Sequence, residues 1–275
     1  MTGASDGVAR GDAAERGDTA EREDAAERGD AAEHALAALA REIVVCRRCP
    51  RLVAWREQVA REKRAAFATQ DYAAHPLPGF GDPRARILLL GLAPAAHGGN
   101  RTGRIFTGDR SGDFLFAALW RTGFASQPTS TASDDGLRLR DAWVTAVVRC
   151  APPANRPTPR ERDACLPWTV RELALLERVR VVVCLGGFAW DAALRVLAPA
   201  GQGPARPPVR RSRFAHGGEH PVGGLRVAPA GEHPVGGDLT LLGCFHPSQQ
   251  NTFTGRLTEP MIDAVLLRAR ALAGP

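Results

Sequence analysis

The chain has 275 residues, 44% hydrophobic and 24% charged, a composition that suits one globular α/β domain with a substantial core. Its longest apolar runs, such as Ile87–Leu92 and Val181–Leu185, are far shorter than the roughly 20 residues that span a bilayer, so no membrane protein is expected. Residues 1–30 are acidic and alanine-rich, without the apolar stretch of a signal peptide. We therefore expect a cytosolic protein.

The charge is distributed unevenly. The net charge is +6, but residues 1–34 hold four arginines and ten acidic residues, which leaves +12 for the rest of the chain. Such a surplus favours a polyanionic partner, nucleic acid first. Lys63 is the only lysine, however, and this arginine bias is also typical of a GC-rich genome.

Two segments look unlike the rest of the chain. Residues 11–34 repeat a hexapeptide of the form GDAAER with no apolar face, so we expect residues 1–33 to form a disordered tail. Residues 201–238 are rich in proline and glycine and contain the string GEHPVGG twice, which indicates a surface insertion. The predicted domain is therefore 34–275, with an insertion at about 201–238.

Strand and helix patterns alternate along this domain. Four short apolar runs predict strands buried on both faces, at 86–92, 143–148, 179–185 and 239–245. Helical patterns occur at 33–63, 111–121, 158–178, 188–197 and 257–272. Thr158, Pro159 and Glu161 form a capping box that marks one helix start. The expected fold is a three-layer α/β/α domain around a central four-stranded, mostly parallel sheet.

The unusual sequence lies in the turns that follow the first and last strands, where parallel sheets bind ligands. Residues 91–109 read GLAPAAHGGNRTGRIFTGD and residues 246–258 read HPSQQNTFTGRLT. Phe106 offers a flat face for a base, and Asp109 is the only carboxylate of the first loop. The alternatives are that Asp109 only caps the helix that begins near Ser111 and that His246 is an ordinary loop histidine.

The six cysteines are not expected to form disulfides in a reducing cytosol. Cys46 and Cys49 form a C-x2-C pair, and Cys150 and Cys165 bracket a segment after the second strand. Four thiolates can hold an iron–sulfur cubane or a structural zinc ion. Cys184 and Cys244 lie inside apolar strands and are expected to be buried core residues.

The two loops together resemble the uracil-DNA glycosylase superfamily, and they look most like its type B (family 5) iron–sulfur enzymes. The resemblance runs from about residue 45 to residue 272, apart from the insertion. It implies a DNA-repair glycosylase that removes uracil and other deaminated or damaged bases from DNA after base flipping. It also implies a 4Fe-4S cluster on Cys46, Cys49, Cys150 and Cys165.

The resemblance also implies roles for residues in the two loops. His246 would hydrogen-bond the base carbonyl and stabilise the leaving anion, and Phe106 would stack on the flipped base. We assign Asp109 to the attacking water or the sugar cation, and Asn155 to the base or its phosphate. The residues expected to line the base pocket are Gly91, Ala93, Ala96, His97, Phe106 and Asn251. Those expected to contact DNA phosphates are Arg101, Arg104, Ser248 and Arg256.

The sequence departs from other branches of the superfamily. Ala93 to Ala96 replace the acidic or amide residue that positions water in many relatives, and Ala146 stands where type A enzymes carry an asparagine. Both losses are typical of type B enzymes and imply a pocket less selective for uracil.

Three other functions are alternatives to that of a uracil-DNA glycosylase. An electron-transfer protein is disfavoured because about 100 residues separate Cys49 from Cys150, whereas ferredoxin cysteines are clustered. A non-catalytic iron–sulfur DNA-binding module differs only in lacking the Asp109, Asn155 and His246 constellation. A variant covalently attached to the abasic product would need a basic loop that is missing here. The expected partner is double- or single-stranded DNA that contains uracil or other deaminated bases, bound by a monomer.

Overall fold

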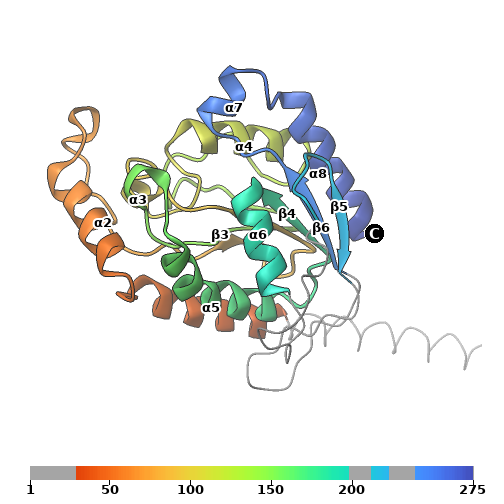
Figure 1. Ribbon diagram of the computed structural model, residues 1–275, viewed down its shortest axis with the longest axis horizontal. Helices are drawn as coiled ribbons and strands as arrows, with labels where there is room; N and C mark the ends of the chain where they lie inside the picture. Colours follow the sequence, from red (N-terminus) through yellow and green to blue (C-terminus); the bar gives the residue numbers. More distant parts are fainter. Residues whose placement is uncertain (1–28, 198–211, 223–238, 275) are drawn as a thin grey trace, which may run out of the picture.

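The computed structural model describes residues 29–197, 212–222 and 239–274 (Figure 1). Most of the predicted tail and most of the predicted insertion lie outside these residues. Among the described helices, none is long and apolar enough to cross a membrane.

A six-stranded sheet forms the centre of the fold, in the order β1-β3-β2-β4-β6-β5. The strands are β1 (Phe80–Gly81), β2 (Ile87–Gly91), β3 (Ala142–Ala146), β4 (Val181–Leu185), β5 (Glu219–Val222) and β6 (Leu239–Cys244). The inner four are the predicted strands, and they are mutually parallel. The prediction of four strands was wrong, because β1 and β5 are two additional short antiparallel strands at the edges of the sheet. Neither coincides with an apolar run in the sequence.

Helices cover both faces of the sheet, as predicted (Figure 1). The helices are α2 (Pro50–Glu62), α3 (Gly99–Thr102), α4 (Arg110–Arg121), α5 (Pro159–Leu175), α6 (Gly187–Val196), α7 (Gln249–Phe253) and α8 (Glu259–Ala273). Residues 29–44 are also helical. This first helix packs with α5 and α6 on one face of the sheet, and α4 and α8 pack on the other. The three-layer α/β/α class is therefore confirmed.

The predicted single helix over 33–63 was wrong. The helix of residues 29–44 ends before the C-x2-C turn, and α2 begins at Pro50 after it. Proline lacks an N–H and clashes with the preceding helical turn, so Pro50 can start a helix but not continue one. The capping box at the start of α5 is confirmed, because Glu161 N donates to Thr158 and the Glu161 carboxylate accepts from Thr158 N.

The strand register aligns the ends of the inner strands. Gly91 at the end of β2 pairs with Ala146 at the end of β3, and Leu185 at the end of β4 pairs with Cys244 at the end of β6. Every residue of β2, β3 and β4 is buried, as expected for strands covered on both faces. The loops that follow β2, β3 and β6 therefore leave the sheet at the same edge.

Candidate active site

Gly91, Phe106 and His246 meet at this edge of the sheet. A Cβ atom at position 91 would lie 2.6 Å from the Phe106 ring, so only glycine lets the ring pack against the end of β2. The rings of Phe106 and His246 have centroids 5.8 Å apart and an interplanar angle of 35°. Phe106 has a positive φ of 55° and is 8% exposed, so little of its ring reaches solvent. The structure thus brings together three residues that the sequence placed in two distant loops.

The loop that carries His246 is fixed on both sides of the histidine. The His246 carbonyl accepts a 2.9 Å hydrogen bond from Asn251 Nδ2 in α7. The preceding Phe245 N–H donates to His216 Nδ1 at 3.1 Å, and the two rings stack with centroids 4.9 Å apart. Burial lowers the pKa of His246 to about 4. The imidazole is therefore neutral near pH 7 and can donate a hydrogen bond without carrying a charge.

Asp109 is the N-cap of α4. Its Oδ1 accepts hydrogen bonds from Ser111 N at 2.9 Å and Gly112 N at 3.0 Å. Its Oδ2 lies against Gly98, where a Cβ atom would approach this oxygen to 2.0 Å. Burial raises the pKa of Asp109, although the two backbone hydrogen bonds oppose the rise. The capping interpretation is confirmed, and it uses only one of the two carboxylate oxygens.

The loop between β2 and α4 also holds the other predicted pocket residues. Ala93 and Ala96 are half-buried in it. His97 Nδ1 lies 3.0 Å from the Tyr72 hydroxyl, and burial lowers the pKa of His97, helped by the nearby Arg64 and Arg101. Buried Asn100 donates from Nδ2 to the Arg56 carbonyl at 3.2 Å, which ties the loop to α2.

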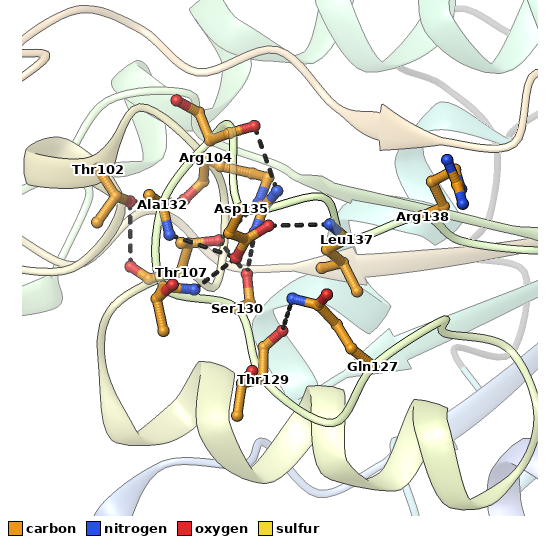
Figure 2. A network of polar contacts seen from close by, with 12 residues as sticks. Thr102, Arg104, Thr107, Gln127, Thr129, Ser130, Ala132, Asp135, Leu137 and Arg138 are labelled. Carbon is orange, nitrogen blue, oxygen red and sulfur yellow. Dashed lines mark hydrogen bonds and ion pairs between the residues drawn. The ribbon is translucent and has the colours of Figure 1, made fainter.

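Two arginines of this loop, Arg101 and Arg104, stabilise its conformation through hydrogen bonds and an ion pair. Arg101 is partly exposed, but its guanidinium donates to the carbonyls of His97 and Gly108, each at 2.8 Å. Arg104 is 7% exposed and forms a 2.7 Å ion pair with Asp135 in the segment between α4 and β3 (Figure 2). Arg104 also donates to Ser130 and Thr107, whose hydroxyls bond each other. Arg104 is therefore occupied within the protein.

The remaining predicted site residues lie nearer the surface. Asn155 is exposed in the 3-10 turn Pro153–Asn155, where it and Ala154 have positive φ angles. Ser248 is the N-cap residue of α7, but its side chain makes no capping hydrogen bond. Arg256 is exposed, and its guanidinium lies 4.7 Å from the centroid of the Phe245 ring. No hydrogen bond or ion pair joins Asn155 to Asp109 or His246 among the described residues.

The four predicted metal ligands line one cavity, at the contact between α2, α5 and the segment after β3. Cys150 and Cys165 are each 9% exposed, and Cys46 and Cys49 are partly buried. Burial raises the pKa of Cys150 to about 11 and that of Cys165 to about 12. As they stand, no three His, Cys, Asp or Glu side chains of the described chain could hold a metal ion. Cys184 and Cys244 are fully buried in β4 and β6, as predicted.

Comparison with known proteins gives the family. The model of the uracil DNA glycosylase superfamily matches residues 78–270. A Type-5 uracil-DNA glycosylase of Thermus thermophilus is 51% identical over 239 residues, 86% of this chain and 98% of the relative. That of Mycobacterium leprae is 49% identical over 241 residues, 87% of this chain and 96% of the relative. This chain belongs to the Type-5 family of the uracil-DNA glycosylase superfamily.

This Type-5 family protein has an alanine, Ala146, at the carboxyl end of β3. Ala146 is the cross-strand partner of Gly91 and is 1% exposed. The position where type A enzymes are expected to carry an asparagine is therefore next to Gly91 in the sheet, and here its side chain is only a methyl group.

Two residues that contact the candidate sites, His216 and Arg56, were not predicted from the sequence. His216, which supports the His246 loop, lies inside the predicted insertion, and no local pattern distinguishes it. Arg56 is 2% exposed and donates to Cys150 Sγ at 3.0 Å. A signal for Arg56 did exist, because Leu52, Arg56 and Val59 share the buried face of α2 at helical spacing.

Proposed function

We propose that this chain hydrolyses the N-glycosidic bond of uracil, and of other deaminated or damaged bases, in DNA. The observation that carries the proposal is the packing of His246 beside Phe106 and Gly91 at the carboxyl edge of the sheet. The names of the relatives support uracil as the base. We further propose that the protein acts as a monomer in the bacterial cytosol, on double- and single-stranded DNA.

The base must first leave the duplex, which costs a few kcal/mol and least for a mispaired base. Phe106 would contact the flipped base with the exposed part of its ring. Gly91, Ala93, Ala96 and His97 would line the pocket with backbone and small side chains. Because neither Ala93 nor Ala146 has a hydrogen-bonding side chain, this pocket would accept more bases than uracil alone.

Bond cleavage leaves negative charge on the base and positive charge on the sugar. The neutral His246 would donate a hydrogen bond to the base carbonyl as that charge develops. Asp109 would face the water or the sugar cation with Oδ2, the oxygen that the helix cap leaves free. Asn251 would act through His246, because its amide holds the His246 carbonyl.

The DNA strand would cross the surface formed by α7 and the turns around it. Exposed Arg256 and the free hydroxyl of Ser248 are suited to phosphate contacts. Asn155 would lie at the edge of this surface and contact the base or a phosphate. Arg101 would contribute less than Arg256, because part of its guanidinium is engaged by backbone, and Arg104 would brace the loop rather than touch DNA.

Cys46, Cys49, Cys150 and Cys165 would hold a 4Fe-4S cluster. Their fit rests on the shared cavity and on the donor set, since four cysteines are the usual ligands of such clusters. When bound, the cluster would cross-link α2, α5 and the segment after β3. The two buried thiols would release their protons to solvent on binding the cluster, since their raised pKa values keep them protonated otherwise.

Replacing Asp109 by asparagine separates its two roles. Asparagine caps helices as well as aspartate, so the unfolding free energy should change little, whereas Asp109→Ala should lower it by about 1 kcal/mol. Both variants should lower the single-turnover rate of uracil release by about tenfold or more, because neither carries the charge. Chemical denaturation and quenched-flow cleavage measure the two effects. An asparagine variant with parental rate would leave Asp109 as a helix cap only.

A gel assay tests the function itself. Oligonucleotides that carry uracil, hypoxanthine or ethenocytosine are incubated with the protein and then treated with alkali, which breaks the strand at an abasic site. Breakage in the uracil lane is expected, with undamaged DNA as the control. Binding without breakage in any lane would favour the non-catalytic DNA-binding module instead.

A further inference from the structure

The described residues include three buried arginines, and they differ in what neutralises them. Arg104 pairs with Asp135 at 2.7 Å, and Arg149 pairs with Glu172 at 2.6 Å. Arg56, which is 2% exposed, has no carboxylate within 4.0 Å among the described residues. Its sequence neighbour Glu57 pairs with the exposed Arg47 instead.

The guanidinium of Arg56 points into the cysteine site. Its Nη1 donates to Cys150 Sγ at 3.0 Å and lies 3.4 Å from the Cys46 carbonyl, and its Nη2 lies 3.5 Å from the same carbonyl. Its Nε has no partner among the described residues. A buried charge with no carboxylate in contact is costly to desolvate, and an anion in contact with this arginine would offset that cost.

We propose that Arg56 is the counter-ion of the iron–sulfur site, where it neutralises part of the cluster's charge and raises its reduction potential. The inference rests on the cluster in the proposed function. A cubane bound by four thiolates carries net negative charge, and one-electron reduction adds to it. A fixed cation in hydrogen-bond contact with one thiolate stabilises the reduced form more than the oxidised form. Hydrogen bonds to sulfur and net charge are known determinants of such potentials.

Two substitutions separate the charge from the hydrogen bond. Arg56→Gln keeps an N–H donor without charge, and Arg56→Lys keeps the charge on a shorter side chain. In Arg56→Gln, the ratio of reduced to oxidised cluster at a fixed potential should fall at least tenfold, which is about 59 mV for one electron. Arg56→Lys should stay closer to the parent. Arg104→Met is the matched control, because it strips a buried arginine of its charge at a site paired with Asp135.

The measurement is protein-film voltammetry or a spectroscopic redox titration of the purified full-length protein, with iron content determined in parallel. An unchanged potential in Arg56→Gln, or an equal shift in Arg104→Met, would overturn the role of Arg56. If Arg56→Gln loses its cluster, the iron content of the two variants tests the proposal. Retention of iron in Arg56→Lys would support the role of Arg56 as counter-ion, and equal loss of iron from both variants would overturn it. A colourless parent without iron would instead refute the cluster, which is a different failure.

Discussion

His246→Ala should lower the single-turnover rate of uracil release by about 100-fold or more, the scale for losing one preorganised donor. The neutral imidazole meets charge that appears on the base only as the bond breaks, so the loss falls on the transition state. Binding to uracil-containing DNA should weaken by less than about tenfold, because affinity comes mainly from phosphate contacts. Single-turnover kinetics and fluorescence anisotropy measure the two quantities.

The pH dependence provides a second check on His246. A histidine with an ordinary pKa of 6.5 would become charged between pH 7.5 and 5.5, whereas burial lowers the pKa of His246 to about 4. The imidazole stays neutral above this value and gains its proton only as the pH falls through it. The rate profile of the parent should therefore show no inflection near pH 6.5.

Arg256→Gln is the complementary control. Arg256 is exposed and lies outside the Phe106 and His246 contact, so its loss should weaken DNA binding and reduce the salt slope by about one. The rate at saturating protein should be largely kept. If His246→Ala cleaves at the parental rate, the catalytic site lies elsewhere in the protein.

Cys165→Ala should abolish both the brown colour and most of the stability that the proposed cluster would contribute. Cys165 lies in α5 and is 9% exposed, so its loss would remove one of the two buried ligands. Metal binding contributes directly to folding free energy when ligands come from separate elements. We expect loss of the visible absorbance, loss of iron, and a fall in melting temperature of more than 10 °C, since each kcal/mol shifts the melting temperature of a domain this size by about 2–4 °C.

Cys184→Ala is the matched control, since Cys184 is also buried but lies inside β4. It should keep its colour and iron and lose about 1 kcal/mol for the small cavity. Purification and metal analysis must be anaerobic, so that oxidation does not remove iron. Zinc without iron in the parent would replace the cluster with a structural zinc site.

Much of the fold could be predicted because the inner strands are apolar throughout. A strand covered on both faces has no alternation, and four such runs between helical patterns indicate a covered parallel sheet. The edges were missed because β1 has two residues and β5 reads Glu-His-Pro-Val, with a proline that central strands avoid. The helix predicted over 33–63 was too long because the helical spacing of apolar residues continues past Pro50, where α2 begins.

Sequence reasoning anticipated which residues come together where a residue type stands out in a loop, as with His246 beside Phe106 and the four cysteines around one cavity. The contacts were less predictable where the partner is distant in sequence. Arg104 looks exposed in a glycine-rich loop, but its partner Asp135 lies 31 residues away in a segment without periodicity. A buried ion pair of this kind leaves no local pattern, and neither does the support that His216 gives to Phe245.

The packing of Asp109 Oδ2 against Gly98 couples mutation at these two positions. Any side chain at position 98 would occupy the space of the carboxylate, so a variant that keeps the aspartate requires glycine there. A library that randomises position 98 alone should return glycine almost exclusively. Randomising both positions together should also return double variants, such as alanine at position 98 with a shorter N-cap side chain at position 109. Single substitutions reach these double variants only through a destabilised intermediate.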